Sequence, residues 1–341
     1  MGICKSKIFK KAPELRYLFR SSPNVIHPSV ASSCSIDNVP QFVIAVNNII
    51  FATKSNIHFE PLEYNTDSYP VSALSLNANV TFLLVAHASG ICLLWSVDSV
   101  RGWSMMSVQS SLYEGWVSAI EWLNETHFIT GSTRGNLRLC SVVGVDVVGL
   151  QESVGHSKSV SCISVLSMED RWICVSGSND GSLTIHAISF SAPDVLCFVK
   201  RVSGHIGLIS DMDSFVFAQD GGAIVVTCGE DKSFRIWSLD NFLVHSSATA
   251  VPHIVNTEDA SLCTVKVSLD GRFVALASTS DIFIYETIIP AFKAISSKKL
   301  YRVPLTLTGI SRLYWGFASL YIHLDSGDFG QVELVSKYHS A

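Results

Sequence analysis

The sequence predicts an all-β chain built from seven similar units, each a meander of antiparallel strands. Short runs of alternating apolar residues recur along the chain and are separated by tight turns such as Asn179-Asp180-Gly181. One position near the end of the third strand recurs every 42 to 51 residues, at Thr53, Trp95, Cys140, His186, Trp237, Tyr285 and Val335. Seven such units leave no segment of the 341 residues long enough for a second domain.

The clearest unit runs from Ser203 to Trp237. Gly204-His205 opens it, and a turn that contains Asp231 precedes the strand that ends at Trp237. This unit resembles the WD-repeat family, whose blades carry Gly-His before the first strand and Trp-Asp, here Trp237-Ser238, after the third. The resemblance implies a single seven-bladed β-propeller of four-stranded antiparallel blades that serves as a scaffold for binding other proteins.

The other six units are weaker copies that are identified by strand alternation and spacing. A four-stranded meander cannot bury both of its faces alone, so we expect the units to stack into a closed ring rather than an open sandwich. In chain order their strands are expected at 42–46 and 49–53; 71–74, 82–85 and 91–95; 128–132 and a run ending at 140; 173–178 and a run ending at 186; 263–267, 273–277 and 282–285; and 310–315, 320–324 and 332–335, with a turn over 325–330.

The last unit has no outer strand of its own, because the chain ends soon after its third strand. In WD-repeat propellers the N-terminal strand commonly fills this place. We expect the apolar run Leu15–Arg20 to close the ring, with Asn24–His27 as an alternative strand and a short helix after Pro13 as the other alternative. Residues 13–341 are therefore assigned to the propeller and residues 1–12 to a separate basic arm.

Charge divides the chain into the same two parts. The net charge is −5, but residues 1–20 carry +5 and the remainder −10. An acidic body argues against broad contact with a nucleic-acid backbone. The nine cysteines form no C-x-x-C pair and lie mostly in apolar runs, which is typical of reduced thiols in a cytosolic or nuclear protein. The sequence contains no uninterrupted run of eighteen apolar residues, so it predicts no membrane span.

The first seven residues fit the pattern for N-myristoylation at Gly2. One acyl chain anchors a protein weakly, and Cys4, as a palmitoylation candidate, together with nearby lysines, supplies the second signal that stable anchoring needs. We therefore expect a cytoplasmic protein, bound at the periphery of an anionic membrane if the arm is acylated. An ordinary basic tail and a mitochondrial-type presequence are the alternatives. A further alternative is a soluble subunit of a nuclear or RNA-processing complex, in which the arm contacts nucleic acid.

The resemblance implies a hydrogen-bonded network inside each complete blade. The four positions are filled by His205, Thr227, Asp231 and Trp237, whereas the preceding unit matches three with His156, Ser176 and Asp180 and has His186 in place of Trp. We expect these residues to satisfy buried polar groups and not to catalyse a reaction, because no G-x-S-x-G elbow is present.

No cofactor site, metal site or enzyme activity is expected, since metal-ligand spacings and phosphate-binding loops are absent from the sequence. An enzyme built on this ring would need carboxylates or histidines that converge at the mouth of the channel.

Antiparallel strands place the loop before the first strand and the loop between the second and third strands at one end of every blade. Trp116, where the histidine is expected, and Arg134, where the aspartate is expected, depart from the pattern and are residue types favoured at binding hot spots. The alternative is that Trp116 packs into its loop and Arg134 is only solvated. The protein-binding surface is expected to contain Trp116, Arg134, Lys158, Glu230, Lys232, Asp328 and Phe329, whereas Trp122, Trp172 and Trp315 are expected in the core.

Overall fold

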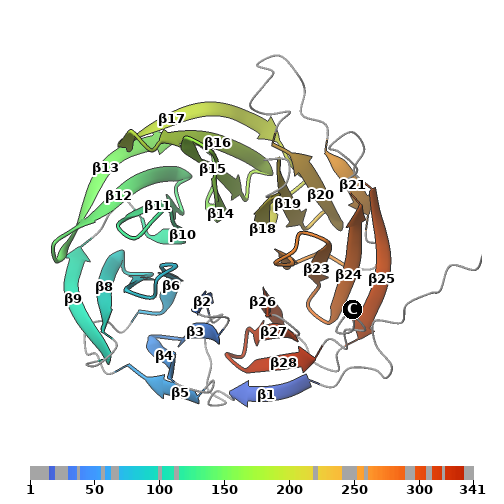
Figure 1. Ribbon diagram of the computed structural model, residues 1–341, viewed down its shortest axis with the longest axis horizontal. Helices are drawn as coiled ribbons and strands as arrows, with labels where there is room; N and C mark the ends of the chain where they lie inside the picture. The colour runs from blue at the N-terminus through green and yellow to red at the C-terminus, as the bar shows by residue number, and fades with distance from the viewer. Residues whose placement is uncertain are drawn as a thin grey trace, which may run out of the picture.

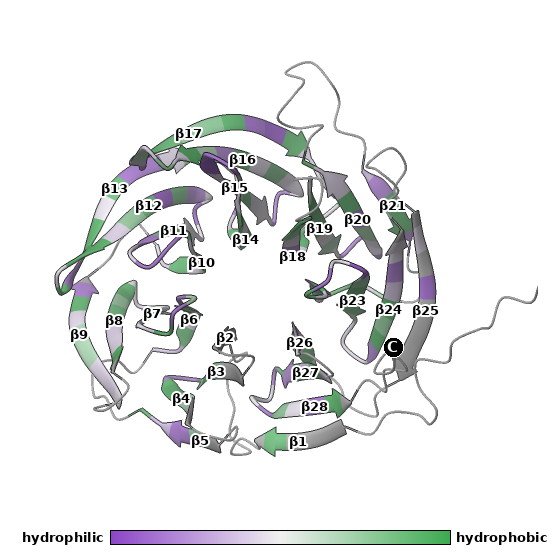
Figure 2. Ribbon diagram, in the orientation of Figure 1, coloured by the Kyte–Doolittle hydropathy of each residue, from purple (hydrophilic) through white to green (hydrophobic). Residues whose placement is uncertain are grey.

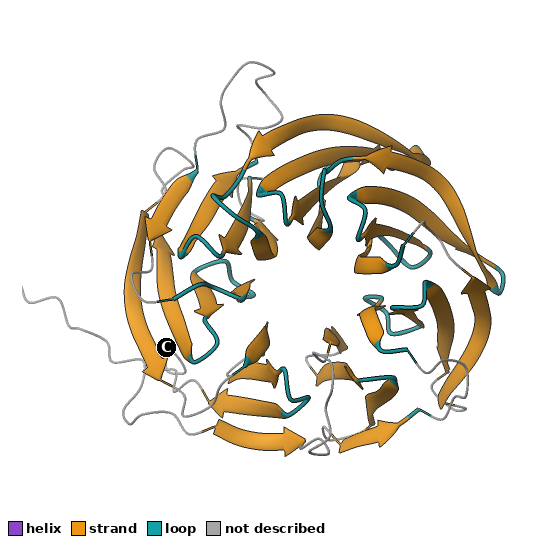
Figure 3. Cartoon of the chain, turned by 180° about the vertical axis from the view of Figure 1, so that it is seen from behind, coloured by secondary structure: helices purple, strands orange, loops and turns teal. Residues whose placement is uncertain are grey.

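The computed structural model describes most of the chain. The described residues are 15–19, 30–36, 39–54, 58–62, 69–98, 102–110, 115–217, 222–239, 252–256, 260–288, 296–304, 309–316 and 319–333. These ranges contain strands, turns and loops (Figure 3), and no helix in them is long and apolar enough to cross a membrane. Gly2 and Cys4 lie outside the described residues, as does the alternative strand Asn24–His27.

The described strands form seven four-stranded antiparallel sheets around a central axis (Figure 1), as the sequence predicts. Each sheet is one blade, with its strands ordered from the axis outward. Blade one contains β2 (Val30–Ile36), β3 (Val39–Val46), β4 (Ile49–Lys54) and β5 (His58–Pro61). Blade two contains β6 (Val71–Leu76), β7 (Phe82–His87), β8 (Ile91–Asp98) and β9 (Gly102–Ser110). Blade three contains β10 (Val117–Trp122), β11 (His127–Ser132), β12 (Asn136–Val143) and β13 (Asp146–Val154).

The second half of the ring repeats this arrangement. Blade four contains β14 (Val160–Ser167), β15 (Arg171–Ser178), β16 (Ser182–Ser189) and β17 (Ala192–Ser203). Blade five contains β18 (Ile209–Val216), β19 (Ala223–Gly229), β20 (Ser233–Ser238) and β21 (His253–Asn256). Blade six contains β22 (Thr264–Val267), β23 (Phe273–Ala277), β24 (Asp281–Ile288) and β25 (Ser296–Pro304). Blade seven contains β26 (Ile310–Trp315), β27 (Ser319–Leu324), β28 (Phe329–Glu333) and, at its outer edge, β1 (Leu15–Phe19).

The burial of each strand follows its distance from the axis. β19 is buried at all seven of its positions, because the neighbouring blades cover both of its faces. β17, at the rim, is mostly exposed and mixes polar with apolar residues (Figure 2). The core therefore consists of apolar layers between successive blades, and no single blade encloses a core of its own.

The ring closes through the first described strand. β1 pairs antiparallel with β28, with Leu15 opposite Val332 and Tyr17 opposite Gly330. The expected closing strand is confirmed, and the helix after Pro13 is wrong as an alternative for this run. The sequence did not predict β2, the inner strand of blade one.

Blade seven corrects one expected surface residue. The turn predicted over 325–330 is shorter, since β28 already begins at Phe329, whose side chain is fully buried. Its ring packs on Phe42 of blade one at a centroid distance of 4.6 Å and stacks with Tyr321 at 6.0 Å. Phe329 therefore helps to seal the joint between the first and last blades and cannot belong to a binding surface.

Two of the three tryptophans expected in the core connect neighbouring blades. The indole Nε1 of Trp122 donates to the Ser75 carbonyl of blade two at 3.1 Å, and that of Trp315 donates to the Lys266 carbonyl of blade six at 2.9 Å. Trp172 packs edge-on against Phe190 within blade four. All three contribute to packing.

Candidate functional site

Blade five contains the complete hydrogen-bonded network. The imidazole of His205 lies 2.8 Å from both the Asp231 carboxylate, at Nδ1, and the Thr227 hydroxyl, at Nε2. The indole of Trp237 donates to the same hydroxyl at 3.0 Å. The four side chains thus connect the loop before β18, the strand β19, the turn and the strand β20. This network holds the loop before β18 and the turn before β20 in place at one end of the blade.

Blade four contains a modified version of the network. His156 contacts Ser176 at 2.9 Å, but its Nδ1 lies 3.6 Å from Asp180, and the Ser182 hydroxyl bridges the two. His186 occupies the register position that Trp237 occupies in blade five, but it does not bond to Ser176. It contacts Ser153 of the neighbouring blade at 3.0 Å.

The electrostatics of these networks favour an ionised aspartate beside a neutral histidine. Burial lowers the pKa of His205, and its contact with Asp231 only partly offsets this shift. Burial opposes ionisation of Asp231, but hydrogen bonds from His205 and Ser233 outweigh it and lower the pKa of Asp231 to about 2. Thr227 is fully buried and His205 nearly so. A substrate cannot reach either group, so the network is structural.

At the same end of the ring, blade three presents an exposed tryptophan. Trp116 is 44% exposed, and its carbonyl accepts a 3.1 Å hydrogen bond from the Thr133 amide in the turn between β11 and β12. Gly115 has a φ of +110°, and a Cβ at this position would lie 2.8 Å from the Thr133 hydroxyl. The loop before β10 and the turn between β11 and β12 are therefore in direct contact. The loop carries Trp116, and the turn carries Arg134, which is exposed.

The structure corrects the register of Trp116. It lies directly before β10, as Leu208 lies directly before β18, and both carbonyls accept from the facing turn. The position that corresponds to His205 is four residues before the strand, which is Tyr113, outside the described residues. Arg134 does occupy the aspartate position, four residues after Thr130, as Asp231 follows Thr227. Trp116 is thus an exposed loop residue and not a replaced network histidine.

The remaining expected surface residues lie in equivalent loops. Lys158 is exposed. Its backbone lies next to the blade three turn, since a Cβ on Gly135 would lie 2.7 Å from the Lys158 carbonyl oxygen. Glu230 and Lys232 are exposed in the turn before β20, and Asp328 is half-buried before β28. The structure places the loops that carry Trp116, Arg134 and Lys158 next to one another across two blades. Glu230, Lys232 and Asp328 lie on other blades.

Sequence reasoning missed two exposed apolar residues at this end. Ile206, 85% exposed, follows the Gly-His pair of blade five, and Tyr69, 55% exposed, precedes blade two. The signal for Ile206 was an isoleucine in a loop between glycines, where an apolar side chain has nothing to pack against.

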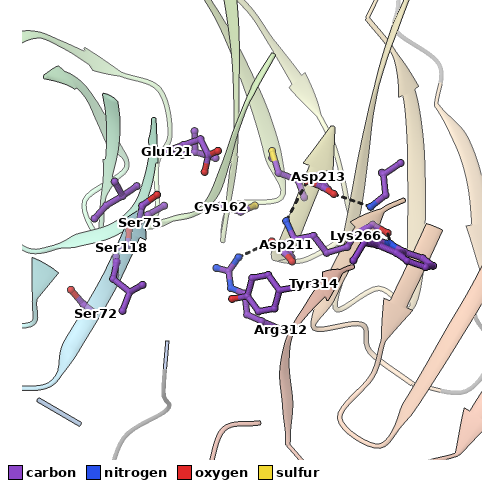
Figure 4. A pocket seen from close by; sticks show the side chains of 18 of the residues that line it. Ser72, Ser75, Ser118, Glu121, Cys162, Asp211, Asp213, Lys266, Arg312 and Tyr314 are labelled. Carbon is purple, nitrogen blue, oxygen red and sulfur yellow. Dashed lines mark hydrogen bonds and ion pairs between the residues drawn. The ribbon is translucent and has the colours of Figure 1, made fainter. Parts of the chain in front are cut away.

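Sequence reasoning also missed a cluster of charged residues in the central channel. They line a cavity of about 290 Å³ and come from the inner strands of four blades: Glu121, Asp211, Asp213, Lys266 and Arg312 (Figure 4). The available signal was the presence of charged residues inside short, otherwise apolar strands, such as Asp211-Met212-Asp213.

Two ion pairs organise this cluster. Asp211 accepts from the Thr264 hydroxyl at 2.7 Å and lies 3.4 Å from the Arg312 guanidinium of blade seven. Asp213 accepts from the Val267 amide at 2.8 Å and lies 3.3 Å from the Lys266 ammonium. Burial opposes the charge on Lys266, but Asp213 and Asp211 raise its pKa. Among the residues that the structure describes, no three His, Cys, Asp or Glu side chains come together as metal ligands.

Comparisons with known proteins show two matches to a repeat model and a shared fold. Residues 149–186 and 196–238 match the family model described as WD domain, G-beta repeat, and each match runs from the outer strand of one blade to the third strand of the next. No curated protein sequence matches the chain.

A chain from the structure titled "Crystal Structure of Mitotic Checkpoint Complex" is similar at a TM-score of 0.73, with 12% identity over 98% of this chain and 99% of that one. In all, 1636 solved chains match, so this likeness shows a widely shared fold and no particular partner.

Proposed function

Because the chain carries WD40 repeats in a closed seven-bladed β-propeller, we propose that it is a non-catalytic scaffold that binds protein partners. The ring supplies rigid loops at one end, and binding residues are commonly placed on loops that a rigid framework positions. The similar solved structure is by its title a complex, which supports an assembly role without naming a partner for this chain.

The observation that carries this proposal is the exposed group formed by Trp116, Arg134 and Lys158. Their loops adjoin where two blades meet. An exposed aromatic residue together with two cations is the composition of an interface hot spot, because aromatic residues and arginine contribute most to binding. We propose that this group binds a partner surface that offers an apolar contact next to carboxylates.

Affinity purification with quantitative mass spectrometry tests the proposal. Trp116→Ala and Arg134→Glu should each leave folding intact and weaken partner affinity by roughly thirtyfold, since hot-spot truncations cost about 2 kcal/mol or more. Leu269→Ala, an exposed apolar residue in a turn at the opposite end of the ring, is the matched control. Unchanged partners in both variants would exclude this surface.

We further propose that the protein acts in the cytoplasm and is held at a membrane through an acylated N-terminus. The support is the sequence alone: the Gly2 motif, Cys4 and the basic residues of the 1–12 arm, which together provide two anchoring signals. Intact mass of the protein made in eukaryotic cells tests this part. A retained Met1 or an unmodified Gly2 would exclude the anchor.

The alternative is that the basic arm contacts nucleic acid in a nuclear or RNA-processing complex. Deletion of residues 1–12 would then abolish salt-sensitive RNA binding and leave membrane fractionation unchanged. The acidic remainder of the chain makes nucleic-acid contact by the propeller itself unfavourable.

A further inference from the structure

The outer rim of blades three and four exposes a concentration of apolar side chains. Eight of the sixteen large apolar residues that are exposed in the described ranges lie on the two outer strands of these blades or in the turn between them. The outermost strands, β13 and β17, adjoin at the rim (Figure 1). Apolar residues scattered singly over a surface are ordinary, whereas a group of them marks an interaction site. The eight residues are Val143, Val145, Val148, Val154, Phe190, Val195, Phe198 and Val199.

β17 carries the densest part of this surface. At twelve residues it is the longest strand that the structure describes, and residues 195–199 within it contain no charge. Val195, Phe198 and Val199 in this stretch are 45%, 56% and 39% exposed. Outer strands are usually protected by shortness or by charge: β5 and β21 have four residues each, and β25 contains adjacent lysines. The centre of β17 has neither protection.

The backbone of β17 is nevertheless closed to a further strand. The side-chain amide of Gln151, on β13, accepts from the Leu196 amide at 2.8 Å and donates to the Leu196 carbonyl at 3.2 Å. Val199 forms a bulge, because the residues on either side of it pair with consecutive residues of β16. Both features obstruct the addition of a strand at this edge. A partner must therefore bind β17 through its side chains.

Opposite charges lie at the two ends of the apolar centre. Asp194 precedes it, and Lys200 and Arg201 follow it. The Asp194 side chain is 66% exposed and lies 3.3 Å from His127. The Arg201 side chain is 46% exposed and pairs with Asp180 at 2.9 Å, and Lys200 is half-buried. The strand thus presents an acidic end, an apolar middle and a basic end.

This order of charges is complementary to its own reverse. A two-fold axis near Cys197, the middle of the stretch, would run two copies of the strand antiparallel. The acidic end of each copy then faces the basic end of the other, and the apolar middles meet. A partner of uniform charge would be repelled at one end. Complementary charge therefore favours a second copy of this chain over another protein.

From these observations we propose that β17 and the adjoining part of β13 form the interface of a homodimer. Val195, Phe198 and Val199 of the two copies pack around the two-fold axis, and Asp194 of each copy faces Lys200 of the other. The inference does not depend on the partner site proposed around Trp116, which lies in the loops at one end of the ring.

Sedimentation equilibrium of the full chain tests the proposal. We expect a reversible dimer at concentrations up to about 100 µM. Phe198→Ala should weaken dimerisation about thirtyfold, because each dimer loses the aromatic ring twice. Trp116→Ala, which truncates an exposed aromatic residue away from the rim, is the matched control and should dimerise as the parent chain does. A parent chain that remains monomeric at about 100 µM would overturn the proposal.

Exchange of the end charges gives a test that a merely damaged variant cannot pass. Asp194→Lys and Lys200→Asp should each weaken dimerisation about tenfold or more, since each places like charges at both ends of the interface. An equimolar mixture of the two variants should dimerise again, because both ends of the mixed dimer join opposite charges. An affinity tag on one variant recovers the other.

Lys158→Asp makes the same charge change in the loop before β14 and is the matched control, which should leave dimerisation unchanged. Single variants that dimerise as tightly as the parent chain would contradict the antiparallel arrangement. A mixture that stays monomeric would contradict it equally.

The thiol of Cys197 reports the position of the two-fold axis. It is exposed, so a short bismaleimide should join the two copies through it. Cys197→Ser should abolish this cross-linked dimer and leave the dimerisation constant within about twofold of the parent value. A cross-link that persists in the variant would place the axis elsewhere and overturn the assignment.

Gln151→Ala distinguishes docking through side chains from pairing of two β17 strands. The variant releases the backbone groups of Leu196 at the edge. Dimerisation should stay within about threefold of the parent value if side chains form the interface. A dimer more than about tenfold tighter would show strand pairing and would overturn the side-chain interface.

Discussion

Blades five and three have the same four-stranded backbone but use equivalent positions in different ways. In blade five, Asp231 and His205 bond to each other and the aspartate is largely buried. In blade three, Arg134 occupies the aspartate position and is exposed, while the Thr130 hydroxyl donates to the Arg138 carbonyl at 3.4 Å. Blade three folds nonetheless, because its strand pairings and the packing between blades are sufficient.

This difference shows that the network is a local reinforcement and not a condition for forming a blade. Packing against the next blade stabilises both: in blade three a Cβ on Gly131 would lie only 2.5 Å from Val160 of blade four. Once a blade is held by its neighbours, its turn residues can change without loss of the fold. The exposed side chains of blade three are therefore free to take part in binding.

The largest expected effect is on the tryptophan of blade five. Trp237→Ala should lower the free energy of unfolding by about 3–5 kcal/mol, because it leaves a cavity and removes the hydrogen bond to Thr227. Cys140→Ala, at the same register position in blade three, should cost about 1 kcal/mol because it removes one atom. Urea unfolding followed by circular dichroism measures both. Similar losses would contradict the contrast between the two blades.

Removing the aspartate charge should have the next largest effect. Asp231→Asn should cost about 2 kcal/mol at pH 7, since the carboxylate accepts from His205, Ser233, Arg235 and the Ile206 amide. Because the folded pKa of Asp231 is lowered to about 2, this contribution should be lost from the parent chain as the pH falls from about 4 to 2. Arg134→Asn in blade three should change the free energy of unfolding by less than about 0.5 kcal/mol.

Acid should destabilise blade four through His186. Burial, with a smaller effect of His156, lowers the pKa of His186 to about 4. Its stabilising contribution is complete above the unfolded pKa of about 6.5 and is lost as the pH falls toward 4. His186→Phe should therefore remove roughly 2 kcal/mol of the acid-induced loss of stability.

Cys140 in blade three is the matched control for this pH effect. Burial raises its pKa to about 12, so its thiol does not titrate in this range. Cys140→Ala should leave the pH dependence of the unfolding free energy unchanged. An acid limb that is the same in the parent chain and in His186→Phe would show that other groups cause it.

The smallest effect is expected from rebuilding the network in blade three. Arg134→Asp restores the aspartate, but Tyr113 stands where blade five has its histidine. We expect a change of less than about 0.5 kcal/mol in the free energy of unfolding. A gain above 1 kcal/mol would mean that the aspartate alone stabilises a blade by bonding to backbone amides.

The sequence predicted the features that depend on neighbouring residues. The seven units, most strands and the closing run from Leu15 follow from alternation and turn residues, which act over a few positions. β2 was missed because Val30–Ile36 contains three serines and lacks regular apolar alternation. Phe329 was placed wrongly because Gly327 and Asp328 extend the turn signal up to it, whereas its burial comes from Phe42 in another blade.

The channel could not be predicted in the same way. Its ion pairs join Asp213 to Lys266, 53 residues away, and Asp211 to Arg312, 101 residues away. These residues meet only because the ring brings the inner strands of blades five, six and seven to one axis. Their pairing is a property of the closed ring, and no local pattern contains it.

The pairing of β1 with β28 also sets the order of events during synthesis. The two strands are more than 300 residues apart, so the first is made long before its partner leaves the ribosome. Until then, the aromatic face of blade one around Phe42 has no Phe329 to cover it. The emerging chain therefore forms an incomplete ring with an exposed apolar surface. Until synthesis of the last blade is complete, that surface is prone to aggregation and is a site for chaperone binding.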